Sequence, residues 1–230
     1  MIDSNIILLI CSCDKYILKA QYQKLTWLKT FQSICSDIPF FHIVGRPNMN
    51  SKYKFDHDQH ILFVQTNDDY NSLPSKMLAA FDAIEREYSY LYIFKTDDDQ
   101  MVSNVNFFNH LSSLLIQQYN TPNSIHYGGQ VIDVKMPHVS EYWQLHPELP
   151  KNLLIKPTKY CSGRFYFISS QAVKELLPRR PAIVLEFLED YAVGFHLPGK
   201  YKTNILKINT GRIFKDIIDQ SPPKMGVVYV

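Results

Sequence analysis

Three consecutive carboxylates are the clearest chemical feature of the sequence. Asp97, Asp98 and Asp99 come two residues after the apolar run at residues 90–94, which has the length of a buried strand. Ligands of open α/β sheets gather at the carboxyl ends of the strands. Two carboxylates spaced one residue apart can share a divalent cation, and Mg²⁺ and Mn²⁺ prefer such oxygens together with substrate phosphates. The pattern therefore favours a metal site, although a solvated turn of helix-capping aspartates has the same sequence.

A second pair of carboxylates lies far from the triplet in sequence. Glu189 and Asp190 fall within residues 184–195, where apolar side chains at helical spacing predict a short helix. A carboxylate on a separate element can act as a general base toward a substrate held at the triplet. A solvated helix face is the alternative interpretation.

Small residues mark a third segment. Tyr160, Cys161, Ser162 and Gly163 lead into a predicted strand at residues 164–169, and small side chains there would let the backbone approach a ligand closely. A plain strand-entry turn is the alternative. Cys161 as a nucleophile has no recognisable local signature to support it.

Short apolar runs alternate with helical patterns over the first 118 residues. Strands are predicted at residues 6–10, 40–44, 61–64 and 90–94. Apolar residues at helical spacing predict a first helix that buries Leu18, Tyr22, Leu25 and Leu28. We expect Ser72 to cap a second helix with Pro74 in its first turn, and Asn104 to cap a third. This order predicts an α/β fold with a mainly parallel central sheet flanked by helices.

The second half of the chain is less regular. Residues 125–134 contain a Gly-Gly pair and suggest a bent hairpin, and residues 138–159 suggest an extended, proline-containing loop. A last strand is expected at residues 204–208. Since no repeat or Gly/Ser-rich linker divides the sequence, residues 1–230 are expected to form a single domain.

Composition excludes several classes of protein. The chain has 230 residues, 46% hydrophobic content and a net charge of +2, which argues against disorder and against a nucleic-acid partner. The longest apolar run near the N-terminus, residues 6–11, is too short to span a bilayer. Four cysteines are too few for a disulfide scaffold. We therefore expect reduced cysteines and a cytoplasmic location, in a host cytoplasm if the gene is viral, or a luminal one if the chain belongs to a longer, anchored protein.

Taken in order, these residues resemble the β1,3-glycosyltransferases that include the β1,3-galactosyltransferases and Fringe. The K-T-D-D-D segment of that family is matched outright by residues 95–99, and its E-D-V-x-x-G segment resembles residues 189–194. The remaining matches are weaker and are found at residues 19–27, 41–46, 68–76, 142–143 and 160–166. The resemblance covers residues 6–197.

The resemblance implies a GT-A-type fold, with a nucleotide-sugar-binding half at residues 1–118 and an acceptor-binding half at residues 119–230. It implies a metal-dependent, inverting hexosyltransferase that uses Mn²⁺ or Mg²⁺. The enzyme would move a sugar of the galactose or N-acetylglucosamine type from a UDP-sugar to a hydroxyl of a glycan, a glycoprotein or another acceptor, with a β1,3 linkage.

The same resemblance assigns roles to individual residues. Asp97 and Asp99 are expected to bind the metal, and Asp97 is also expected to contact the ribose or sugar of the donor. Asp98 is expected to support the loop formed by the three aspartates. Arg46 and Lys76 are expected at the donor site. Asp190 takes the second acidic position of its segment and is therefore expected to be the general base, with Glu189 as the competing candidate.

The sequence also departs from the family pattern. Phe165 replaces the second glycine of the Y-C-S-G-x-G-Y segment and is expected to reshape the acceptor side. The C-terminal stretch that often supplies a histidine ligand has none, and Asn209 sits near the expected place. Trp143 is a candidate for stacking on a sugar or for the core.

Two other functions stay open. A carbohydrate- or nucleotide-binding module could keep the fold without turnover. A metal-dependent phosphoryl-transfer enzyme could use the same triplet, although the sequence has no P-loop.

Overall fold

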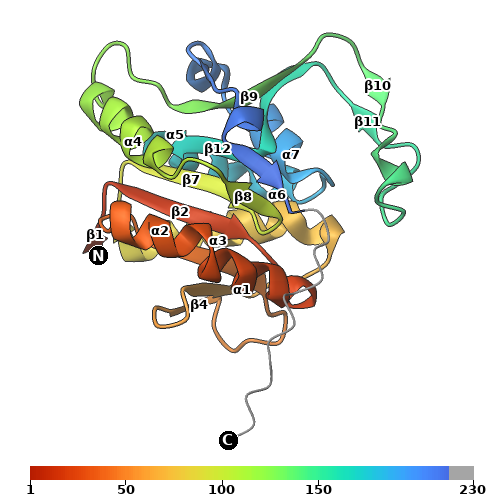
Figure 1. Cartoon of the computed structure of the whole chain (residues 1–230). Coiled ribbons are helices and arrows are strands. Elements are labelled where there is room, and N and C mark those ends of the chain that lie inside the picture. Colours follow the sequence, from red (N-terminus) through yellow and green to blue (C-terminus); the bar gives the residue numbers. More distant parts are fainter. Residues whose placement is uncertain (218–230) are drawn as a thin grey trace, which may run out of the picture.

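One eight-stranded sheet runs through the computed structural model, which describes residues 1–217 (Figure 1). The strand order is β13-β9-β12-β7-β2-β3-β5-β4. In chain order these strands are β2 (Ile6–Cys11), β3 (Phe40–Gly45), β4 (Tyr53–Asp56), β5 (Ile61–Val64), β7 (Tyr92–Asp97), β9 (Tyr127–Val134), β12 (Thr158–Ser169) and β13 (Leu206–Lys207). Strands β7, β2, β3 and β5 are mutually parallel, and β12 pairs antiparallel with both β7 and β9. The predicted α/β class with a mainly parallel centre is confirmed.

Helices cover both faces of this sheet because the central strands are apolar on both sides. Ile7 and Leu9 of β2 belong to one core cluster with helices α3 (Leu73–Glu87), α5 (Ser170–Leu176) and α7 (Glu189–His196). Ile6 and Leu8 belong to the other, with α2 (Trp27–Ile34) and α4 (Asn106–Gln118). A last helix, α6 (Arg180–Ile183), packs beside α3. No helix within residues 1–217 is long and apolar enough to cross a membrane.

The first predicted helix is two helices. α1 (Ile17–Leu25) ends at Thr26, whose backbone leaves the helical region with φ −114° and ψ −109°, and α2 follows directly. The predicted buried face was wrong for Leu18 and Leu25, which are 59% and 75% exposed. The buried residues of α1 are Ala20 and Gln23 instead. The side-chain amide of a buried glutamine needs hydrogen-bond partners inside the protein.

Two predicted helix caps do not form. Ser72 makes no side-chain capping bond to α3; Asp69 instead accepts a hydrogen bond from the Ser72 backbone amide at 2.9 Å, in the turn before the helix. Pro74 does lie in the first turn, as predicted. Asn104 lies outside α4, whose N-cap is Val105.

The second half departs furthest from the prediction. The hairpin expected at residues 125–134 is the single strand β9, and its glycines serve close packing. A Cβ on Gly128 would lie 2.5 Å from the Phe167 ring. Short strands β1 (Ile2–Asp3) and β6 (Tyr88–Ser89) pair with each other, as do β8 (Gln100–Val102) and β14 (Phe214–Asp216).

Residues 135–157, called the arm here, project from the end of β9 and return into β12 (Figure 1). The arm was predicted to be an extended loop. It contains a small antiparallel pair, β10 (His138–Val139) and β11 (Leu154–Ile155), with a short helical turn at Tyr142–Gln144 between them.

Candidate active site

The acidic triplet stands at the carboxyl end of β7, as its sequence predicted. Asp97 is the last residue of that strand and pairs with Cys11 at the end of the parallel neighbour β2. The side chain of Asp97 is 33% exposed. Burial raises its pKa to about 6, although the Lys95 ammonium opposes the shift.

Lys95 is the buried cation of this site. Its ammonium lies 2.7 Å from Asp97 Oδ1 and 3.0 Å from Glu189 Oε2, and it donates a hydrogen bond to the Gly163 carbonyl at 3.0 Å. Burial lowers its pKa, but the two carboxylates outweigh that effect and hold the pKa well above its ordinary value. Lys95 therefore ties the end of β7 to α7 and to β12.

Glu189 and Asp190 have different surroundings although they are neighbours. Glu189 is 5% exposed, forms a salt bridge with Lys95 and accepts a hydrogen bond from the Tyr166 hydroxyl at 2.6 Å. Asp190 Oδ2 accepts a hydrogen bond from the Gly163 amide at 2.9 Å. Burial raises the pKa of Asp190, whereas the charge of Lys95 and the backbone N–H donors lower it. Both carboxylate oxygens of Glu189 are thus engaged by buried side chains, whereas the hydrogen bonds that Asp190 accepts come from backbone amides.

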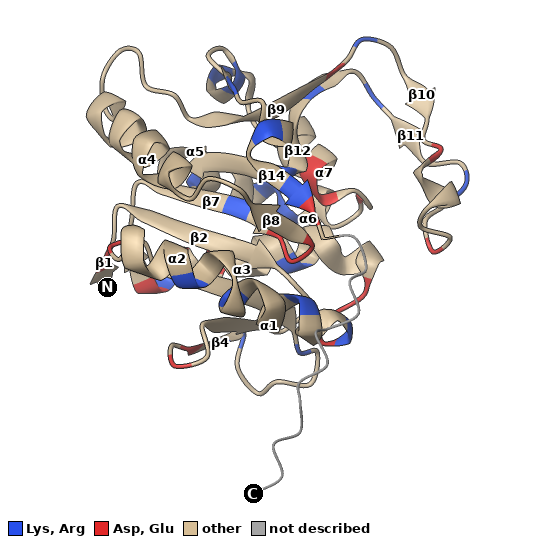
Figure 2. Ribbon diagram, in the orientation of Figure 1, with Lys and Arg blue, Asp and Glu red and all other residues tan. Residues whose placement is uncertain are grey.

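Gly194 lets α7 pack closely against β12, and Gly163 of β12 lies between Asp97 and Asp190. A Cβ on Gly194 would lie 2.2 Å from Tyr160 Cβ, so only glycine lets α7 lie this close to β12. A Cβ on Gly163 would lie 3.4 Å from Asp97 Oδ2 and 3.6 Å from Asp190 Oδ2. The carboxylates of Asp97 and Asp190 therefore converge on the same glycine, although 93 positions separate them in sequence. In Figure 2 the acidic end of β7 and the start of α7 lie on one side of the molecule.

A buried polar chain holds the backbone of the triplet. Gln23 Nε2 donates to the carbonyls of Asp97 and Gln100 at 3.0 and 2.8 Å, and Gln23 Oε1 lies 3.0 Å from His42 Nε2. Asp98 is 6% exposed and accepts from the Ser12 hydroxyl at 2.8 Å. Asp98 therefore supports the loop, which leaves Asp97 and Asp99 as the members that face outward.

A further carboxylate lies beside Asp99. Gln100 Nε2 donates both to Asp99 Oδ1 at 2.9 Å and to Asp216 Oδ1 at 2.8 Å. Asp216 lies on β14 and is also held by Arg164 at 2.9 Å. Asn209 was the residue expected near this position. Asp216 could not be predicted from the sequence, because only the pairing of β14 with β8 brings it here.

The described residues do not by themselves enclose a metal ion. Within residues 1–217 no group of three or more His, Cys, Asp or Glu side chains is close enough to hold one. The outward-facing carboxylates of Asp97 and Asp99 nevertheless fit a hard cation of the Mg²⁺ type. Such a cation is commonly bound through one or two protein carboxylates, with water and substrate phosphates completing its shell.

The galactosyltransferase family model matches residues 21–206. This chain belongs to the galactosyltransferase family. It is accordingly a glycosyltransferase, as the sequence predicted, and the match spans the triplet, Gly163 and Asp190.

Solved glycosyltransferase structures resemble this family member at low identity. One is a glycosyltransferase involved in the glycosylation of the major capsid of PBCV-1, with 13% identity, 90% of this chain and 82% of that chain covered, and a TM-score of 0.49. Another is the galactosyltransferase LgtC in complex with donor and acceptor sugar analogues, with 12% identity, coverages of 89% and 73%, and a TM-score of 0.44. No curated protein matches the chain in sequence.

The two basic residues predicted at the donor site differ in exposure. Lys76 is 1% exposed, and its ammonium donates to the Ser12 carbonyl at 2.7 Å and to Asp68 Oδ1 at 2.8 Å. It thus acts on the site only through Ser12 and Asp68, and direct donor contact is not supported by this geometry. The side chain of Arg46 is 41% exposed; its guanidinium pairs with Asp14 and lies over the Phe63 ring, 5.2 Å from the ring centroid.

Phe165, which was expected to reshape the acceptor side, lies in the core of this glycosyltransferase. It is fully buried, and its ring stacks on Phe214 of β14 at 5.0 Å. Because Phe214 and Asp216 share β14, the phenylalanine that replaces the family's glycine helps to hold Asp216 beside Asp99.

Proposed function

We propose that the protein is a metal-dependent, inverting hexosyltransferase that uses a UDP-sugar. The observation that carries the proposal is the convergence of Asp97 and Asp190 on Gly163. A transfer needs one group that holds a charged donor and a second that receives a proton from the acceptor. The end of β7 and the start of α7 supply one carboxylate for each task.

The proposed reaction is a single displacement. Asp190 takes the proton of an acceptor hydroxyl while that oxygen attacks the anomeric carbon of the donor. The bond between the anomeric carbon and the diphosphate oxygen breaks, its electron pair leaves with UDP, and the configuration at the anomeric carbon inverts. Hydrogen bonds from Gly163 and Tyr191 orient the Asp190 carboxylate for this role.

The donor side is proposed to contain Asp97, Asp99 and Arg46, with Asp98 and Lys76 holding the surrounding loops. Mn²⁺ or Mg²⁺, held by Asp97 and Asp99, would neutralise the diphosphate as it leaves. Lys95 keeps Asp97 ionised at neutral pH, since its positive charge opposes the effect of burial on the Asp97 pKa.

The remaining elements of the proposal concern specificity and location. We propose transfer of a galactose or N-acetylglucosamine type of sugar in a β1,3 linkage to a glycan or glycoprotein. Residues 1–118 would hold the nucleotide sugar and residues 119–230 the acceptor.

We also propose a location in the cytoplasm. All four cysteines are free thiols, namely Cys11, Cys13, Cys35 and Cys161, which supports a reducing compartment.

A donor screen tests this proposal. The protein is incubated with UDP-galactose, UDP-N-acetylglucosamine and UDP-glucose in the presence and absence of Mn²⁺, with simple methyl glycosides as acceptors, and UDP release is measured. Release of UDP that needs Mn²⁺ is expected for at least one donor. Binding without release would indicate a non-catalytic module, and release of inorganic phosphate would indicate phosphoryl transfer.

A further inference from the structure

The arm rests on the body of the molecule through a stack of three aromatic rings. His146, on the arm, stacks on Tyr70 of the body with ring centroids 4.0 Å apart and planes 18° apart. Tyr142 continues the stack on the arm, 5.2 Å and 19° from His146. Next to the stack, Asn71 Nδ2 donates to the Glu148 carbonyl at 3.1 Å. These contacts fix where Tyr142 lies relative to the sheet.

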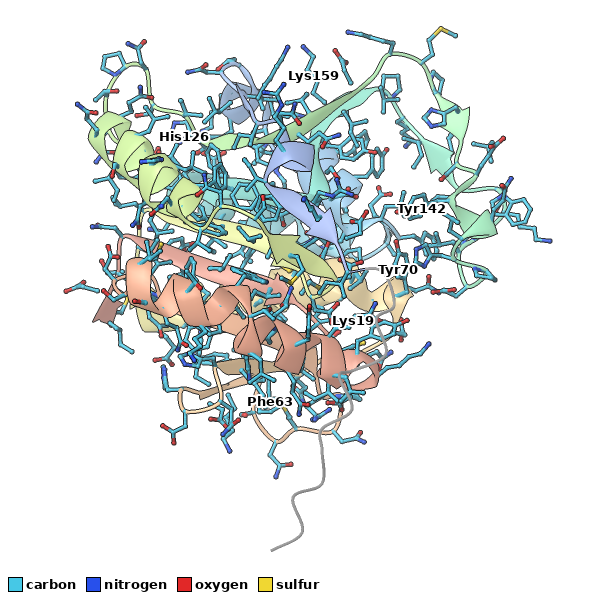
Figure 3. The ribbon with its side chains drawn as sticks, in the orientation of Figure 1. Lys19, Phe63, Tyr70, His126, Tyr142 and Lys159 are labelled. Carbon is cyan, nitrogen blue, oxygen red and sulfur yellow. The ribbon has the colours of Figure 1, made fainter. Side chains whose placement is uncertain are left out.

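Tyr142 lies at the end of this stack. Figure 3 places Tyr70 and Tyr142 between the arm and the body. Tyr142 is 46% exposed, and its ring stacks on His146. Burial raises the pKa of the Tyr142 phenol, and the charges of Asp190, Asp97, Asp99 and Asp216 raise it further. Tyr142 is therefore partly accessible to a ligand, and the carboxylates that we assign to the reaction act electrostatically on its phenol.

Trp143, the neighbouring aromatic residue, is differently engaged. The Lys151 ammonium covers its ring at 5.0 Å from the centroid, which is a contact within the arm. Trp143 was considered as a ring that stacks on a sugar, but the contacts of the arm favour Tyr142 for that role.

We infer that Tyr142, held by His146 and Tyr70, is the platform on which the sugar ring of the acceptor stacks while its hydroxyl reaches Asp190. This inference rests on the proposed function and deepens it by naming the acceptor subsite. An aromatic face offers flat apolar area for the C–H face of a pyranose. A ring supported by two others also loses little conformational freedom when a ligand binds.

The carboxylates around this platform favour an uncharged sugar, because Asp190 and Asp216 are not among the proposed metal ligands and are not neutralised by the metal cation. The charged groups that act most strongly on Tyr142 are the carboxylates of Asp190, Asp97, Asp99 and Asp216, and the buried cation Lys95 is already paired with Asp97 and Glu189. A like charge brought close to them is unfavourable. The platform should therefore accept a neutral hexoside and reject a uronic acid of the same shape.

Steady-state kinetics with defined acceptors tests the inference. The acceptor probes are methyl β-D-galactopyranoside, methyl β-D-glucopyranoside and methyl β-D-glucuronide, with the donor that the screen selects. Tyr142→Ala should raise the KM for the best neutral glycoside roughly 10-fold and leave the Kd of UDP, measured by calorimetry, within 2-fold of wild type, a limit of about 0.4 kcal/mol. Tyr142→Phe keeps the ring and should keep the KM. Leu145→Ala is the matched control, because Leu145 is on the same arm, is 73% exposed and is not in the stack.

A direct measurement of glycoside binding tests the acceptor subsite independently of the proposed transferase activity. Saturation-transfer NMR with methyl β-D-galactopyranoside and methyl β-D-glucopyranoside in the presence of UDP reports the subsite without turnover. If the wild type releases no UDP but Tyr142→Ala loses the NMR signal that Leu145→Ala retains, the subsite stands and the transferase proposal fails. An unchanged KM and unchanged NMR binding in Tyr142→Ala would overturn the inference, as would weaker UDP binding with normal glycoside binding. Preference for the glucuronide would overturn the selection for an uncharged ring.

Discussion

Replacing Lys95 with methionine should destabilise the fold strongly, because it leaves two carboxylates without their cation. Lys95 is 2% exposed and contacts Asp97 at 2.7 Å and Glu189 at 3.0 Å. Breaking a buried ion pair by removing one partner costs roughly 3–5 kcal/mol. For a chain of 230 residues that corresponds to a fall in Tm of about 6–20 °C.

The pH dependence of this loss follows from the pKa of Asp97. That pKa already lies at about 6 in the folded state with the Lys95 charge present, and removing the charge raises it further. A carboxyl group whose pKa is raised on folding destabilises the fold as the pH rises through that pKa. The loss in Lys95→Met should therefore be largest near pH 8 and smaller near pH 5.

Urea denaturation followed by fluorescence, with chelator present, measures this effect. The double variant Lys95→Met/Glu189→Gln should recover part of the loss, since the glutamine carries no charge and still accepts from Tyr166. Lys135→Met is the control, because Lys135 also pairs with an aspartate but is 75% exposed, and it should leave the unfolding free energy unchanged. A loss below about 1 kcal/mol at pH 8 for Lys95→Met, the size expected of an exposed pair, would refute the reasoning.

Three further predictions concern acid stability, the metal and the pH profile. His42 is buried, and burial lowers its pKa to about 3. The neutral imidazole therefore contributes to the free energy of unfolding above the ordinary pKa of about 6.5, and this contribution is lost as the pH falls toward 3. In urea titrations at several pH values, His42→Gln should reduce the fall in unfolding free energy between pH 6.5 and pH 3. An unchanged dependence of the unfolding free energy on pH would exclude His42 as the source of that fall. Excess chelator should weaken UDP binding in calorimetry and Asp99→Ala should mimic it, whereas an unchanged Kd in both would remove the metal from the donor site. Because Asp190 must be ionised to act as a base and burial raises its pKa, the acid limb of kcat should have its midpoint above the ordinary aspartate value of about 3.9; a midpoint at or below that value would contradict the assignment.

The fold could be predicted where the sequence pattern is local. The apolar strand Ile6–Cys11 is buried on both faces, and its pattern already required helices on both sides of the sheet. The hairpin prediction failed because Gly128 and Gly129 were interpreted as turn residues, whereas Gly128 lies against Phe167 of β12. Nothing in the local sequence distinguishes a glycine that turns the chain from one that admits a neighbouring ring.

The site could be predicted where a motif matched and not where tertiary contacts alone supply the partner. The family resemblance singled out Asp97 and Asp190, and the structure brings both to Gly163. Gln23 and Asp216 were missed, because their contacts with the acidic loop span 77 and 116 residues of sequence. The resemblance predicted that Lys76 lies at the sugar-donor site. In the structure the Lys76 ammonium is buried and donates hydrogen bonds to Ser12 and Asp68.

The most direct test of the account compares wild type with Asp190→Asn. The substitution keeps the size of the side chain and removes its basicity, so it should leave the affinity for UDP unchanged. Transfer, measured as UDP release with the selected donor and a neutral methyl glycoside, should fall roughly 10²–10⁴-fold, the usual contribution of a general base. Turnover close to wild type in Asp190→Asn, with turnover abolished in Glu189→Gln whose fold is intact by circular dichroism, would contradict the central claim.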